Sequence, residues 1–252
     1  MQLWMHGLLD ADNDRRKEPY YHGDLIRLIA SHPDFIFLLY PISGHGHALE
    51  SILQNLRELR ARLPSQNVDA VLLAWESSTL VSAFEKPLRR ERKSQYKAQL
   101  QAWAGQGSDW NNTLAIIDQL EALAESGVAV ITIAGNGGRG MVNTFSFARG
   151  VVTVGAIEDE LGDFVSDNAL VDRHEQAAYF ALRVDSENGE PKGYDLDGDG
   201  CTDIPLSSLS GHRAGRQDYP ARSWPPLKGS SFAAPRALKK ILLEGRSQRG
   251  CR

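Results

Sequence analysis

A pair of serines near the carboxyl end of the chain has the setting of a nucleophile. Ser230 and Ser231 stand between Gly229 and the run Phe-Ala-Ala-Pro, which opens a helical pattern over 233–243. Glycine permits a tight turn, and a proline in the first helical turn costs little because its missing N–H would be unpaired there. The free N–H groups of the helix start would face whatever Ser231 attacks. A helix N-cap is the alternative role, so Ser231 needs partners elsewhere in the chain.

Three more polar residues lie at the ends of predicted elements. Asp10 follows an apolar, strand-like segment at 3–9, and open α/β sheets carry their sites at the carboxyl ends of strands. Asp12 is its rival, and an Asp-rich turn is the other interpretation. His22 opens the helical pattern at 25–30, and Asn136 follows the β-branched run at 128–134. An asparagine among glycines can also be a simple turn residue.

In order and context these residues resemble the subtilisin-like serine proteases. The serine segment is similar to the family's Gly-Thr-Ser-Met-Ala-Ala-Pro, and His22-Gly23 to the start of its His-Gly-Thr-His. Ala134-Gly135-Asn136 resembles the end of its Ala-Ala-Gly-Asn, and the order aspartate, histidine, serine is the same. The resemblance extends over most of the chain and is weakest over 159–226.

The resemblance implies the function of a serine endopeptidase. Ser231 would be the nucleophile, His22 its general base, and Asp10 the carboxylate that orients the histidine. Asn136 and the Ser231 backbone N–H would donate to the oxyanion. No cofactor is required for this chemistry, and the expected partner is a peptide or protein substrate.

The sequence departs from the family around the substrate. The family's Asp-Ser/Thr-Gly motif corresponds here to Asp10-Ala11-Asp12, which lacks the glycine. Trp75 and Glu76 begin the segment that replaces the family's substrate-pairing edge Ser-Leu-Gly-Gly. By position, the resemblance assigns substrate binding to Trp75, Glu76, Ala134 and Gly135. A catalytically weak or inactive peptide-binding module with the same fold is therefore the alternative function.

Two other groups of residues suggest metals. His45 and His47 resemble zinc ligands, but they lack a third ligand and are predicted to lie in a loop between a buried strand at 35–40 and a helix at 49–63. Carboxylates also alternate in one stretch, at Asp195, Asp197, Asp199 and Asp203. Gly200 takes the sixth place of a calcium loop, but Leu206 replaces the bidentate glutamate of the twelfth. Ca²⁺ and an acidic turn both remain open.

The whole chain predicts one α/β domain. Strands at 35–40, 68–74, 128–134 and 151–156 alternate with helices, which indicates a mostly parallel central sheet flanked by helices. The resemblance implies that this α/β domain has the subtilisin-like three-layer fold. We expect this domain to span 1–245, with a disordered tail at 246–252, and to be a monomer.

Charge and hydropathy exclude some classes of partner. With 32 acidic and 28 basic side chains the formal net charge is -4, so no basic field favours nucleic acid. No stretch approaches the roughly 18 apolar residues of a membrane span, and no signal peptide is visible. Two cysteines leave the redox compartment open. The cytoplasm is favoured, or secretion if the chain is a mature fragment.

Overall fold

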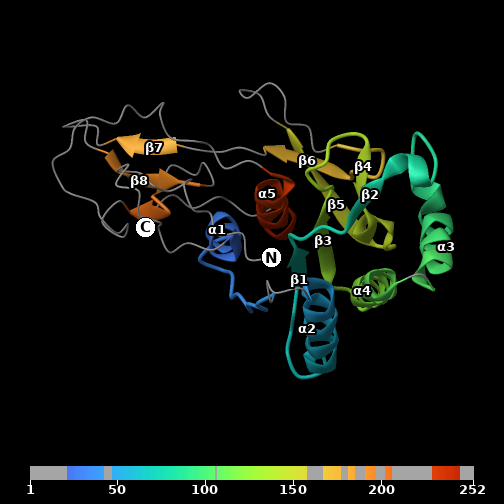
Figure 1. Ribbon diagram of the computed structural model, residues 1–252. Helices are drawn as coiled ribbons and strands as arrows, with labels where there is room; N and C mark the ends of the chain where they lie inside the picture. The colour runs from blue at the N-terminus through green and yellow to red at the C-terminus, as the bar shows by residue number, and fades with distance from the viewer. Residues whose placement is uncertain are drawn as a thin grey trace.

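A parallel sheet with helices on both faces forms the centre of the protein (Figure 1). The computed structural model describes residues 22–42, 47–105, 107–157, 167–176, 181–184, 191–196, 202–205 and 229–244. In these residues four parallel strands lie in the order β1–β3–β5–β6. Their bounds are Ala70–Leu73, Ala129–Ile133, Val151–Ile157 and Arg173–Gln176. The predicted α/β architecture with a mostly parallel central sheet is confirmed.

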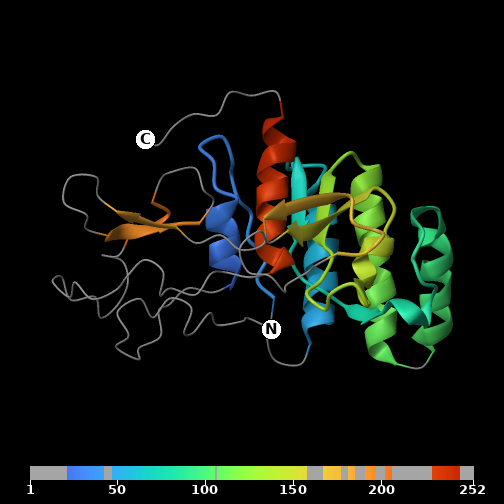
Figure 2. The same ribbon diagram turned by 90° about the horizontal axis from the view of Figure 1, so that it is seen from above.

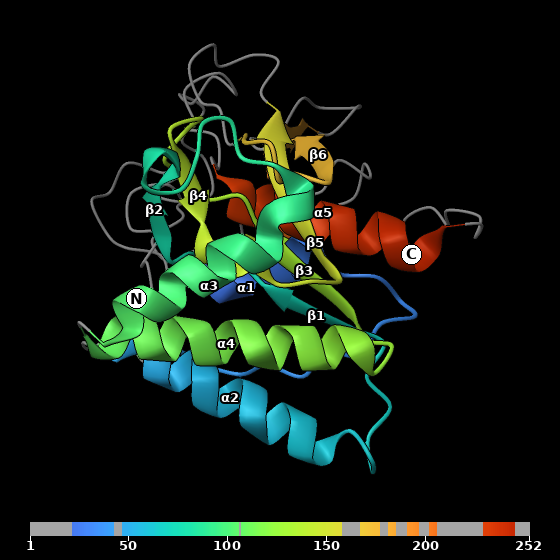
Figure 3. The ribbon, with the colours of Figure 1, turned by 90° about the vertical axis from the view of Figure 1, so that its right-hand side faces the viewer.

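The helices lie in layers on either side of this sheet (Figure 2). On one face are α1 (His22–Ile29) and α5 (Ser230–Leu243), which pack against each other. On the other face are α2 (Ala48–Arg62) and α4 (Ser108–Glu125), which lie side by side in Figure 3. A further helix, α3 (Lys93–Ala104), packs on the outer side of α4.

Short elements connect and extend the layers. β2 (Ser78–Leu80) pairs antiparallel with β4 (Met141–Asn143), and the short 3-10 helices η1, η2 and η3 span Val81–Ala83, Arg90–Arg92 and Thr144–Phe147. A separate antiparallel sheet contains β7, β8 and β9, with bounds Ala181–Val184, Pro191–Asp195 and Ile204–Pro205. None of the helices in the described ranges combines the length and the apolar character that crossing a bilayer requires.

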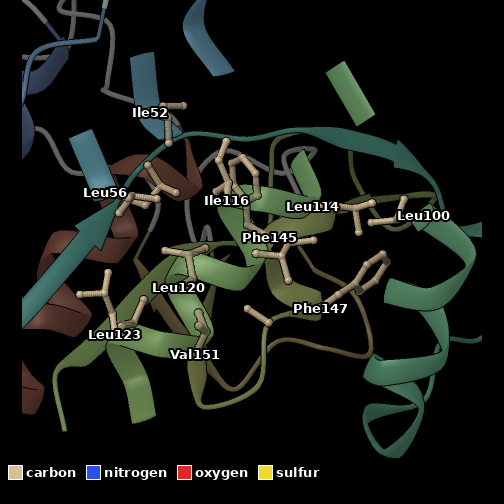
Figure 4. Close-up of a cluster of buried hydrophobic side chains, with 14 of the residues drawn as sticks. Ile52, Leu56, Leu100, Leu114, Ile116, Leu120, Leu123, Phe145, Phe147 and Val151 are labelled. Atoms are coloured by element: carbon tan, nitrogen blue, oxygen red, sulfur yellow. The ribbon is translucent and has the colours of Figure 1, made fainter. Parts of the chain in front are cut away.

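The larger core lies between the sheet and α4 (Figure 4). Ile117 and Leu120 of α4 are fully buried, and Phe145 and Phe147 of η3 fill the space beside them. In β3, Val130, with 1% of its surface exposed, belongs to this core. Neighbouring β3 side chains point to the opposite face, so the strand is buried on both faces, as its β-branched sequence predicts.

A second core fixes α5 on the other face. Ala233, Ala234 and Ala237 are fully buried against Ile131 and Val154 of the sheet. Because alanine is small, it lets the helix backbone approach the strands closely. The start of α5 is thereby held against the sheet.

Two sequence predictions about elements were wrong. Residues 35–40 form no strand, and Ile36 is 95% exposed while Phe37 packs against the second core. A continuous apolar run suggested burial on both faces, whereas the described chain gives it no partner strand. The last helix begins at Ser230 rather than at 233, so Pro235 lies beyond the first turn and offers no N–H to the Ser231 carbonyl.

Candidate active site

Ser231 lies at the start of α5, where the chain turns sharply from Gly229. Gly229 has φ +147, and an added Cβ there would lie 3.2 Å from Ser231 Oγ. The Gly229 carbonyl accepts the first helical hydrogen bond, from Phe232 N at 2.9 Å. Within the described chain the Ser231 N–H has no acceptor, as is usual for the first N–H groups of a helix. Ser231 therefore presents a hydroxyl and a free backbone donor together.

His22 makes the first polar contact with this hydroxyl. Its Nε2 lies 2.9 Å from Ser231 Oγ, although the two residues are 209 positions apart. His22 begins α1, and Leu25 of that helix is fully buried, while the His22 ring lies 5.3 Å from the Phe232 ring. Packing of α1 against α5 thus brings the imidazole to the serine.

The charge state of His22 suits a proton acceptor. Burial lowers the pKa of His22 from 6.5 to about 4. The imidazole is therefore neutral at physiological pH and can accept a proton from the Ser231 hydroxyl. An unperturbed histidine would still be partly protonated there.

Asn136 flanks the same glycine from the sheet side. It follows β3, and its Oδ1 accepts from Ser230 N at 2.9 Å and from Ser230 Oγ at 3.0 Å. An added Cβ at Gly229 would lie 3.6 Å from Asn136 Nδ2. In the residues that the structure describes, Nδ2 has no acceptor, so its N–H groups are available next to Ser231.

The proposed substrate-binding residues have different surroundings. Trp75 packs against the larger core, and Ala134 is buried with its N–H donating to Val154 O at 2.8 Å. Gly135 has φ +95, and Glu76 Oε2 lies 2.5 Å from where its Cβ would be. Glu76 Oε2 also accepts from Asn136 N at 2.8 Å. Gly135 and Glu76 therefore lie next to Asn136, whereas Ala134 and Trp75 pack against the protein interior.

Sequence reasoning missed Asn143, which is fully buried behind the site. Its Nδ2 donates to Ile133 O at 2.8 Å and to Trp75 O at 3.1 Å. Its Oδ1 accepts from Ser77 N at 3.1 Å and from Phe145 N at 3.3 Å. The side chain thus ties the ends of β1 and β3 together. The signal in the sequence was an amide among the apolar residues of Met-Val-Asn-Thr-Phe.

The remaining candidates are only partly within the described chain. Asp10 and Asp12 lie outside it, and no described carboxylate forms an ion pair with His22. His47 is exposed and pairs with Glu50 at 3.2 Å, whereas His45 lies outside the described residues. The tail at 246–252 also lies outside them.

Comparison with known proteins found similarity only to solved structures. The chain matches no protein-family model, and no characterised protein is similar to it in sequence. A lanthipeptide protease is 17% identical with a TM-score of 0.45, covering 87% of this chain and 57% of that one. The prenylagaramide maturation protease PagA is 13% identical with a TM-score of 0.39, covering 83% and 52%. The patellamide maturation protease PatG is 12% identical with a TM-score of 0.34, covering 77% and 42%. The chain spans about half the length of these structures, and no residue role is taken from them.

The lowered pKa of His22 predicts a pH-dependent stability. Between about 4 and 6.5 the unfolded chain binds a proton that the folded protein excludes, so stability falls as the pH falls through this window. Relative to His22→Gln, the wild-type free energy of unfolding should drop by about 3 kcal/mol from pH 7 to pH 4. Urea unfolding at a series of pH values measures this. The control variant His47→Gln, at an exposed histidine, should lose as much stability as the wild type over this pH range. The prediction would be contradicted if the free energy of unfolding depended on pH in the same way in the wild type and in His22→Gln.

Calcium binding stays a prediction. Asp203 Oδ2 accepts from Leu196 N at 2.7 Å and Asp195 is buried, while Asp197 and Asp199 lie outside the described chain. Among described residues no group of three potential metal-ligating side chains occurs. If the loop binds Ca²⁺, the folded state gains roughly 2.7 kcal/mol at a hundredfold excess of ion over Kd. Thermal melting in chelator and in millimolar calcium tests this. An unchanged melting temperature would reject the calcium loop and favour the interpretation as a hydrogen-bonded acidic turn.

Proposed function

We propose that the chain is a subtilisin-like serine endopeptidase. The observation that supports this most is the 2.9 Å contact between His22 Nε2 and Ser231 Oγ. A serine hydroxyl is a weak nucleophile until a neutral base can take its proton, and burial keeps His22 neutral. The contact provides that base at hydrogen-bond distance.

The acylation step uses groups that lie together in the structure. Ser231 Oγ attacks the carbonyl carbon of the scissile peptide bond while its proton moves to His22 Nε2. The carbonyl oxygen becomes an oxyanion, which the Ser231 N–H and Asn136 Nδ2 would bind. When this tetrahedral intermediate collapses, the C–N bond breaks and the imidazolium gives its proton to the leaving amine.

Deacylation repeats the same steps with water. His22 takes a proton from a water molecule, whose oxygen attacks the acyl carbon, and the ester bond to Ser231 breaks. The proton returns to Ser231 Oγ and the carboxylic acid product leaves. In this mechanism Asp10 would accept a hydrogen bond from His22 Nδ1 and stabilise the imidazolium.

Removing members of the site gives the main test of this function. A serine-directed phosphonate should label the wild type, and Ser231→Ala should abolish labelling. His22→Ala should suppress it nearly as strongly, because the nucleophile and its base act as a unit. The labelling rate should be constant from pH 6 to 8 and fall towards pH 4 as His22 is protonated. Mass spectrometry of the labelled protein gives the site and the rate.

Two matched variants serve as controls for this experiment. Ser230→Ala should retain most of the labelling, since the Ser230 N–H still holds Asn136 Oδ1. His47→Ala should retain all of it, because that histidine pairs only with the surface residue Glu50 among described residues. A folded wild type that is not labelled between pH 5 and 9 and cleaves no peptide of a mixed library would reject the protease and leave the peptide-binding module.

The identity of the orienting carboxylate gives a second test. We expect Asp10→Asn to lower kcat by about 10⁴-fold, because loss of the carboxylate leaves the histidine in the wrong tautomer. Asp12→Asn should have a mild effect, because Asp10 directly follows the predicted strand. Steady-state kinetics of the two variants measure both effects. A larger loss of kcat in Asp12→Asn than in Asp10→Asn would assign the orienting role to Asp12.

A further inference from the structure

Glu76 is a partly buried carboxylate without a cationic partner in the described part of the chain. Three other shielded glutamates there are neutralised, among them Glu85 by Arg92 at 2.9 Å and Glu121 by Lys97 at 2.6 Å. Glu175, likewise, is paired with Lys240 at 2.6 Å. Shielding a charge from water costs free energy, which a paired cation offsets. Glu76 therefore differs from these three ion-paired glutamates.

The carboxylate of Glu76 is fixed through one of its two oxygens. Oε2 accepts from Asn136 N at 2.8 Å and from Ser78 Oγ at 3.2 Å. Gly135 leaves the room for it, because an added Cβ would lie 2.5 Å from Oε2 and 2.8 Å from Ser78 Oγ. No hydrogen bond to Oε1 is formed by any described residue. One oxygen thus holds the group in place while the other remains an acceptor.

The position of this charge matters for the reaction proposed above. Glu76 contacts the backbone of Asn136, and the Asn136 side chain would bind the oxyanion. A carboxylate beside developing negative charge raises the energy of the transition state. A cation on the substrate, bound to Glu76, would remove this repulsion and gain a charge-assisted hydrogen bond.

We propose that Glu76 selects substrates that carry a cationic side chain, lysine or arginine, close to the scissile carbonyl. This inference rests on the proposed function and adds its substrate class. Oε1 would accept from the substrate cation, and Oε2 would keep its bonds to Asn136 and Ser78. The preference belongs to catalysis as well as to binding, because the cation offsets charge that is greatest in the transition state.

Matched peptides test the selection. Fluorogenic substrates would differ only in lysine or its uncharged analogue norleucine, at the residue that bears the scissile carbonyl or at the one before it. Hydrogen bonds to charged groups predict a preference of kcat/KM for lysine of about tenfold or more at one of these positions. Glu76→Gln, whose amide oxygen can still accept from Asn136 N, should reduce this preference below about threefold. Lysine cleavage should slow because the ion pair is lost, and norleucine cleavage should rise because the charge beside the developing oxyanion is gone. Glu125→Gln, at an exposed carboxylate of α4, is the control and should keep the wild-type preference.

A second measurement needs no variant and separates the two proposals. Phosphonates with a lysine-like or a norleucine-like side chain should label Ser231 of the wild type at rates that differ by about tenfold. Equal rates with successful labelling would overturn the role of Glu76 and leave the protease intact. A lysine preference that survives in Glu76→Gln would also overturn it. Failure of both phosphonates and of all peptides would reject the protease, and the inference with it.

Discussion

The side-chain amide of Asn143 is the interaction on which the geometry of the site depends. Two neighbouring parallel strands end at the site, β1 leading to Glu76 and β3 leading to Asn136. Beyond their last ladder bonds the two chains would separate, and their backbone groups would be buried without partners. Asn143 donates to the carbonyls of Trp75 and Ile133 and accepts from the N–H of Ser77, so it replaces the missing ladder. Because it is fully buried, water cannot substitute for these bonds.

The serine and the histidine reach this edge by a different physical route. Neither lies on the sheet: each begins a helix, and both helices pack on the face opposite α4. The alanines of α5 set its distance from the strands, and α1 then packs against α5. The site therefore combines a sheet edge held by hydrogen bonds with two helix starts held by apolar contacts. A change in either core moves one half of the site relative to the other.

The parts of this structure that could be predicted from sequence are those with local signals. The β-branched run of β3, the glycine before Ser230 and the helical pattern of α2, predicted at 49–63, each indicate their own conformation, and all three form as expected. Residues 35–40 could not be judged in this way, because an apolar run does not reveal whether a partner strand exists. The pKa of His22 and the role of Asn143 could not be predicted either, since both result from burial by residues distant in sequence. Nor does the sequence show that Glu76 lacks a cationic partner among described residues, because this depends on where the lysine and arginine side chains lie in the folded protein.

The wide separation of His22 and Ser231 along the chain has a consequence for how their contact forms during folding. Closing a loop of 209 residues is entropically unfavourable, and folds rich in such distant contacts form slowly. A chain emerging from the ribosome exposes the histidine long before the serine has been synthesised. In the proposed mechanism, partly folded or truncated forms would contain the base without the nucleophile and would not cleave neighbouring nascent chains. Docking of α5 would then be the step that assembles the reactive pair.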